Sequence, residues 1–157
     1  MKKMILIAVL FCMTVTSATA QEVYNEIYRI SAKVADSTEL NIESRKIATF
    51  KVDALKYMAM RAAEQMPDSS AYMLDKQAYA MYDFVNYYLS RLSAASKDKQ
   101  KEVVKAVFKE ASINNSRYHD MDKDLVLSYY NNDNFITQFS LDTDWEKANQ
   151  IVHDYPW

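Results

Sequence analysis

Three groups of side chains in this sequence combine residue types that are able to do chemistry. The first group is Asp120, Asp122 and Asp124, whose alternate spacing matches the opening of a calcium-binding loop. Such a loop needs glycine at its sixth position and glutamate at its twelfth, where this chain has Leu125 and Asn131. We therefore interpret the three carboxylates as acids at a helix N-terminus, where the helix dipole favours negative charge.

The second group contains both histidines of the chain. His119 lies beside the same acids, and His153 precedes Asp154. A zinc or iron site would need both imidazole rings together with Asp120 or Asp122, brought close by the fold. Because nothing in the spacing requires such a site, we favour surface histidines, and we expect neither a metal ion nor another cofactor.

The third group is a row of aromatic and acidic residues on one predicted helix. Tyr79, Asp83 and Tyr87 follow one another at helical intervals of four, with Lys76 and Arg91 nearby. Exposed tyrosines on either side of a carboxylate are able to stack on a sugar or to receive a peptide, which makes these three residues the candidate ligand-binding site. The interpretation that we favour is that another helix covers the row, and that a tyrosine hydroxyl donates a hydrogen bond to Asp83.

The helix that carries this row is the predicted centre of the fold. Apolar residues recur over residues 74–92 at intervals of four and three. The seam consists of Leu74, Ala78, Met81, Val85, Tyr88 and Leu92, and it is widened by Tyr82, Phe84 and Leu89. Such a wide apolar surface is more than one neighbouring helix buries, so we expect helices on several of its sides.

Two helices are predicted to precede this central helix. Residues 22–35 form the first, with an apolar stripe at Val23, Ile27, Ile30 and Val34. Residues 41–52 alternate as a strand does, but they also begin a helical pattern that continues to Met66. Helix propensity favours the helix, although the pattern alone leaves the alternative open.

Further helices are predicted after the central one. Residues 97–112 form a charged helix, whose lysines alternate with acids in a pattern typical of a solvated face. Residues 120–130 form a short helix, and the last helix is predicted to open with a capping box between Thr143 and Glu146.

The absence of glycine sets the fold class. A chain with no glycine and two prolines has few residues that break a helix or permit a tight hairpin. It also lacks the phosphate-binding loops, dinucleotide-binding loops and nucleophile elbows that require glycine. We therefore expect an all-α fold, in which residues 21–157 form a single-domain antiparallel bundle of about five to six helices.

Residues 1–20 have the organisation of a cleavable signal peptide. Two lysines precede an apolar run over residues 4–15, and small residues then lead to an Ala-x-Ala site that ends at Ala20. A lipoprotein signal with an acylated Cys12 is disfavoured because the bulky Phe11 comes directly before it. We expect an exported protein, periplasmic or extracellular, with no stable membrane span after cleavage; an uncleaved anchor is the alternative.

Composition narrows the function. The formal net charge is −2 and the single cysteine lies in the signal segment, so neither nucleic-acid binding nor thiol chemistry is expected of the mature chain. We expect a non-catalytic binding or structural module of the cell envelope whose partner is another envelope or secreted protein. The alternatives are a glycan- or peptide-binding protein that uses its tyrosines and a carboxylate-dependent hydrolase.

Overall fold

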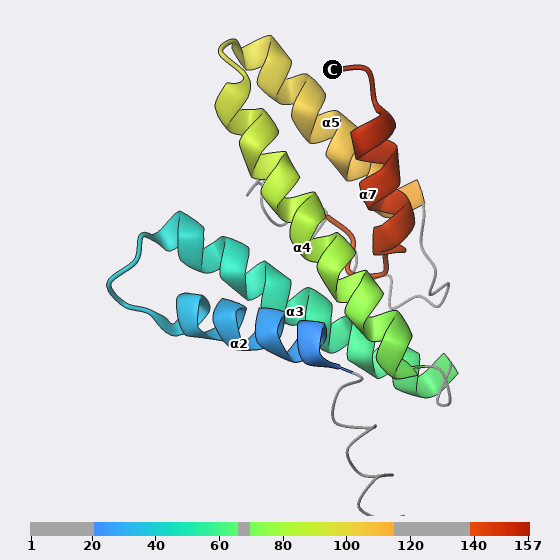
Figure 1. Cartoon of the computed structure of the whole chain (residues 1–157). Helices are drawn as coiled ribbons and strands as arrows, with labels where there is room; N and C mark the ends of the chain where they lie inside the picture. The colour runs from blue at the N-terminus through green and yellow to red at the C-terminus, as the bar shows by residue number, and fades with distance from the viewer. Residues whose placement is uncertain (1–20, 66–69, 115–138) are drawn as a thin grey trace, which may run out of the picture.

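The described part of the chain folds into a bundle of packed helices. The structure is a computed structural model that describes residues 21–65, 70–114 and 139–157. Within these ranges the chain forms helices only: α2 (Glu22–Asp36), α3 (Ile42–Gln65), α4 (Ser70–Ala94), α5 (Asp98–Asn114) and α7 (Trp145–Asp154) (Figure 1). The predicted all-α class is therefore confirmed. The predicted signal segment and the helix over residues 120–130 lie outside the described residues.

Helix α4 is the centre of the bundle. It contacts α2 and α3 on one side and α5 and α7 on the other (Figure 1). The predicted seam is buried at Leu74, Ala78, Met81, Val85 and Tyr88, whereas Tyr82, Leu89 and Leu92 are only partly buried. The periodicity of α4 thus identified the buried face, and the three partly buried residues lie at its edges.

Aromatic rings fill the middle of the core. The Phe84 ring packs edge-on against the rings of Phe108 (4.9 Å between centroids), Phe139 (5.2 Å) and Trp145 (5.5 Å). The Phe50 ring of α3 joins the same cluster, because its centroid lies 6.1 Å from that of Trp145. Rings at these distances gain edge-to-face attraction in addition to the burial of their apolar area.

Residues 41–52, which fit either a strand or a helix by pattern, begin helix α3. Its N-terminus is capped by Asn41, whose Oδ1 accepts a hydrogen bond from the Ser44 backbone N–H at 2.8 Å. The face turned toward the core contains Phe50, Ala54, Leu55, Met58 and Ala62, all of them fully buried. Helical spacing of buried residues through the ambiguous stretch and beyond it explains why the helix forms.

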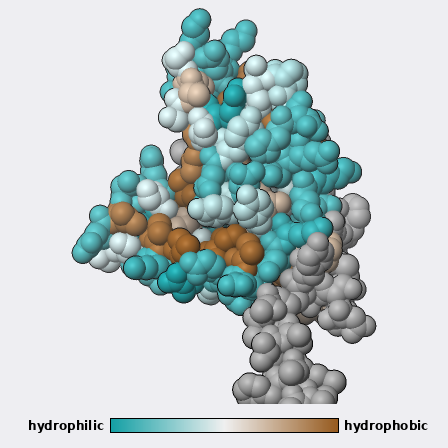
Figure 2. All heavy atoms as spheres, in the orientation of Figure 1, coloured by the Kyte–Doolittle hydropathy of each residue, from teal (hydrophilic) through white to brown (hydrophobic). Residues whose placement is uncertain are grey.

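Helix α2 buries the predicted stripe only in part, because Ile27 belongs to the core and is only 8% exposed. Val23 and Ile30 of the predicted stripe are 39% and 44% exposed, while Tyr24 and Tyr28 pack against the core. Tyr24 is held by two hydrogen bonds: its Oη donates to the Leu55 carbonyl at 3.0 Å, and its N–H donates to Asp75 Oδ1 at 2.8 Å. The expected stripe is therefore correct at Ile27 and wrong at Val23 and Ile30, and exposed hydrophobic side chains remain visible over the α2–α3 hairpin (Figure 2).

The predicted capping box of the last helix is also wrong. Asp144 is the N-cap residue of α7, and its side chain accepts a hydrogen bond from the Lys147 backbone N–H. The Thr143 hydroxyl lies one residue earlier and donates to the carbonyls of Ser112 and Ser140, both at 2.8 Å. Thr143 therefore ties residues 139–143 to the end of α5 and does not cap the helix.

Candidate functional site

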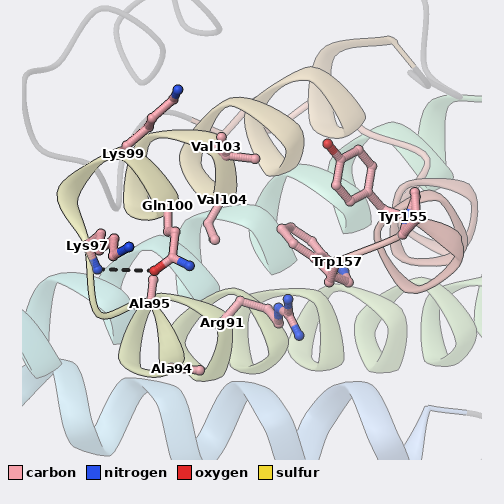
Figure 3. A pocket seen from close by; sticks show the side chains of 11 residues that line it. Arg91, Ala94, Ala95, Lys97, Lys99, Gln100, Val103, Val104, Tyr155 and Trp157 are labelled. Atoms are coloured by element: carbon pink, nitrogen blue, oxygen red, sulfur yellow. Dashed lines mark hydrogen bonds between the residues drawn. The ribbon is translucent and has the colours of Figure 1, made fainter.

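A cleft of about 490 Å³ lies between the α4–α5 turn and the segment that follows α7. The last turn of α4 and the first turns of α5 form one wall, and residues 155–157 form the other (Figure 3). Its lining consists of Arg91, Ala94, Ala95, Lys97, Lys99, Gln100, Val103, Val104, Tyr155, Pro156 and Trp157. This lining combines three cationic and two aromatic side chains, and it includes neither Asp nor Glu.

The aromatic wall of the cleft is fixed by its contacts with the core. Trp157 Nε1 donates a hydrogen bond to the Val152 carbonyl at 2.9 Å, which ties the segment after α7 back onto that helix. The Trp157 ring lies 5.7 Å from the Phe108 ring and 4.8 Å from the Tyr155 ring, centroid to centroid. Tyr155 is 38% exposed, so the wall presents aromatic surface to the solvent.

The Arg91 side chain lies against this wall. Its guanidinium carbon is 4.3 Å from the centroid of the Trp157 ring, and the two side chains lie beside each other in the close view (Figure 3). This is the distance of a cation–π interaction, which restrains the side chain without using the N–H groups of the guanidinium. The Arg91 Nε is buried and has no hydrogen-bond partner among the residues that the structure describes.

Among the described residues, the three cationic side chains of the cleft lack the close acidic partners that other lysines of α5 have. Within the described ranges, Arg91, Lys97 and Lys99 form no ion pair, whereas Lys101 and Lys105 of the same helix α5 lie 3.8 Å and 2.7 Å from Asp98 and Glu102. Lys99 extends from the rim of the cleft away from the aromatic wall (Figure 3). The cleft thus has a positive rim and a partly apolar interior, an arrangement that favours an anionic ligand.

The turn that shapes the rim is held by a glutamine. Gln100 Oε1 accepts hydrogen bonds from the Lys97 backbone N–H at 3.2 Å and from the Ser96 hydroxyl at 3.3 Å. A side chain that satisfies an N–H at the start of a helix fixes the direction in which the chain enters it. Lys97 and Lys99 are therefore carried by an ordered turn.

The predicted row of Tyr79, Asp83 and Tyr87 is not part of the cleft lining, although the Tyr87 ring borders the cleft, 6.3 Å from the Trp157 ring. Asp83 Oδ2 accepts a hydrogen bond from Asn149 Nδ2 at 2.9 Å and lies 3.0 Å from His153 Nε2. The expected tyrosine partner of Asp83 is thus wrong: the two partners come from α7, which passes beside this face of α4. Sequence pattern did not identify them because they are 66 and 70 residues away along the chain.

The two tyrosines of the row have different surroundings. The His153 ring stacks on the Tyr87 ring, with 4.1 Å between centroids and 10° between planes, so one face of Tyr87 is occupied. Tyr79 is 62% exposed and lines an open hollow of about 470 Å³ beside Lys76 and Glu146. Ligand binding by these three residues stays a prediction, and a ligand stacked on the covered face of Tyr87 would have to displace His153.

We expect Asp83→Ala to lower the free energy of unfolding by about 0.5–1.5 kcal/mol, because Asn149 and His153 would lose their shared acceptor at a half-exposed site. Asp83→Asn is the matched control, since it keeps an acceptor oxygen and should cost less. Urea denaturation of the variants measures both values. A neutral Asp83→Ala would contradict the helix-bridging role and leave the row as a free surface.

Lys51 on α3 is a charged group inside the bundle. Its side chain is only 8% exposed, and its Nζ donates to Asn86 Oδ1 at 2.9 Å and lies 4.2 Å from the centroid of the Tyr82 ring. Burial lowers the pKa of Lys51 to about 8, because the charged ammonium loses its hydration. Burial also raises the pKa of Tyr24 and, more strongly, that of Tyr88.

These shifts predict a maximum of stability in the alkaline range. Between about pH 8 and pH 10 the unfolded chain holds the Lys51 proton and the folded chain releases it, so the free energy of unfolding should rise by about 1–3 kcal/mol. Above about pH 10, Tyr24 and Tyr88 ionise first in the unfolded chain, and stability should fall. Denaturant titrations at successive pH values test this, and Lys51→Met should lack the rise. Identical profiles for the two proteins would contradict the assignment.

The residues of the cleft were not among the predicted site residues. The pattern of residues 97–112 predicts only that Lys97 and Lys99 lie on a solvated face, and this holds for both. The signal that was available is the aromatic pair Tyr155 and Trp157 directly after a helix, next to a proline. Its importance depends on α7 returning to the α4–α5 turn, which local periodicity does not report.

Only one of the residues considered as possible metal ligands lies in the described part of the chain. His153 is an exposed histidine paired with Asp83, while His119, Asp120, Asp122 and Asp124 lie outside the described residues. Within the part of the chain that is described, no group of three or more His, Cys, Asp or Glu side chains is arranged to hold a metal ion. Among the same residues, no helix has the length and apolar character needed to cross a membrane.

Comparisons with known proteins add no family to this geometry. No protein-family model matches the chain, and the searches of curated proteins and of solved structures give no significant match. The functional inference therefore depends on the residues of the site alone.

Proposed function

We propose that this chain is a non-catalytic binding module of the cell envelope that holds an anionic ligand in the cleft between the α4–α5 turn and residues 155–157. One observation carries the proposal: three cations without acidic partners among the described residues gather around a cleft with two aromatic side chains. Cationic side chains without acidic partners, placed around a partly apolar cleft, attract and hold an anion. The volume of about 490 Å³ is that of a small-molecule site.

Export of the protein is part of the same proposal. Its support is the basic start, the apolar run and the Ala-x-Ala site within residues 1–20. Mass analysis of the protein recovered from its native cells should find Gln21 at the N-terminus. Recovery of the folded protein with Met1 retained would contradict cleavage.

Ligand binding is tested by NMR titration of the purified protein with three small anions: sodium butyrate, sodium benzoate and phenyl phosphate. We expect at least one of them to shift the backbone amide signals of residues 91–104 and 155–157, with weaker effects at higher salt because exposed charges are screened. Butyramide and benzamide are the neutral controls. If none of the three anions shifts these signals more than the two neutral amides do, the proposed function is wrong.

A further inference from the structure

The geometry points to an aromatic carboxylate as the ligand of this cleft: a flat ring that carries one carboxylate group. This inference rests on the proposed function and narrows it to one chemical class. It follows from the position of Arg91 on the aromatic wall, from the shape of that wall and from the distribution of the remaining charges.

Arg91 is arranged to bind a planar anion. Its guanidinium carbon lies over the Trp157 ring, 4.3 Å from the ring centroid, and the buried Nε leaves the terminal nitrogens as the donors that remain for a ligand. Two N–H groups of a guanidinium match the two oxygens of a carboxylate in one plane. Because contact with the Trp157 ring already restrains the side chain, less conformational entropy is lost when a carboxylate binds to the guanidinium.

The wall beside Arg91 suits a flat ring. The Tyr155 and Trp157 rings are inclined by 58° to each other, so they form an angled aromatic surface. Val104, which is only 4% exposed, and the neighbouring Val103 provide apolar contact from α5. An aromatic ligand gains edge-to-face and offset-stacking contacts on such a surface, whereas an aliphatic ligand of similar size gains only the burial of area.

The two lysines of the cleft provide positive charge but no selection for the shape of the anion. Lys97 and Lys99 are exposed at the rim, where an ammonium group acts as a hydrated point charge that attracts any anion. They raise the affinity of the cleft for anions in general but do not select a planar group. Selection for the carboxylate therefore depends on Arg91, and selection for the ring depends on Tyr155 and Trp157.

The test uses the purified full chain and four probes, with affinity measured by NMR titration. Sodium 2-naphthoate has both the carboxylate charge and the aromatic ring. Of the other probes, 2-naphthamide lacks the charge, sodium cyclohexanecarboxylate lacks the aromatic ring, and inorganic phosphate has charge without a ring. We expect 2-naphthoate to bind about tenfold more tightly than each of the other three. Equal binding of cyclohexanecarboxylate or phosphate would overturn the aromatic-carboxylate assignment and leave the anion-binding function standing. If no anion binds, both proposals fail.

Substitutions of the cleft residues test which side chains select 2-naphthoate over phosphate. Arg91→Lys keeps the charge but removes the planar donor pair, so the affinity for 2-naphthoate should fall about tenfold while that for phosphate changes little. Lys99→Met should weaken both anions by similar factors, and Lys33→Met on α2, far from the cleft, should change neither. An Arg91→Lys protein that folds and keeps its preference for 2-naphthoate would overturn the role of Arg91. Circular dichroism establishes folding, and if this variant does not fold, the four-probe series on the unchanged protein decides.

Discussion

Phe84→Ala is expected to lower the free energy of unfolding by about 3–5 kcal/mol, a large share of the stability of a domain of this size. The side chain is fully buried on α4, which contacts each of the other helices in the described part of the chain, and its ring meets those of Phe108, Phe139 and Trp145. Alanine would leave a cavity that these three rings, each held from a different segment, are unable to fill together. Chemical denaturation followed by far-UV circular dichroism measures the loss.

Two matched variants separate the cavity from other effects of the substitution. Phe84→Leu keeps most of the volume and should cost less than about 1.5–2 kcal/mol, chiefly through the lost ring contacts. Tyr79→Ala removes an aromatic ring of similar size from the exposed face of the same helix and should change stability by less than about 0.5 kcal/mol. Equal losses for Phe84→Ala and Tyr79→Ala would mean that the core is not centred on Phe84.

The sequence predicts the centre of this fold well because α4 has neighbours on several sides. A helix surrounded by other helices needs a wide apolar seam, and the spacing of Leu74, Met81 and Val85 reports that seam directly. The absence of glycine in turn predicts helices, whatever the partners of each helix are. Neither signal depends on which helices lie side by side, so both predictions hold in the folded protein.

The orientation of α2 was less predictable for a physical reason. Its aliphatic stripe and its tyrosines lie on adjacent faces, and tyrosine buries a large apolar ring while its hydroxyl needs an acceptor. The Leu55 carbonyl supplies that acceptor for Tyr24, and Asp75 accepts from the Tyr24 backbone N–H. Both partners lie on other helices, so the choice between the two faces depends on tertiary contacts that periodicity does not contain.

The same limit applies to the candidate site. Arg91 is visible in the sequence as a base near the end of α4, but its contact with Trp157 joins residues from two separate helical segments. The partners of Asp83 likewise come from α7. Sequence spacing reports which residues share one helix face, whereas a cleft depends on which helices lie side by side.

Gln77 is expected to be the polar residue whose loss costs most among those that join α4 to α7. It is fully buried, its Oε1 accepts a hydrogen bond from the Trp145 backbone N–H at 2.7 Å, and its Nε2 donates to Asp144 Oδ1 at 2.8 Å. The Trp145 N–H belongs to the first turn of α7, where no carbonyl of the same helix is available to accept it. Gln77 therefore completes the start of one helix from the middle of another.

Gln77→Met, which keeps the length of the side chain and removes both polar groups, should lower the free energy of unfolding by about 2–4 kcal/mol, because the buried Trp145 N–H loses its acceptor and Asp144 loses a donor. Gln77→Glu is the informative partner variant. Its carboxylate still accepts from Trp145 but lies beside Asp144 and Glu146, so its cost should be largest at neutral pH and decrease as the introduced carboxyl group becomes protonated in acid. Denaturant titrations of both variants between pH 4 and pH 8 measure this, each value compared with the unchanged protein at the same pH. A Gln77→Glu protein whose loss of stability is independent of pH would show that the donated hydrogen bond to Asp144 is not what fixes α7 on α4.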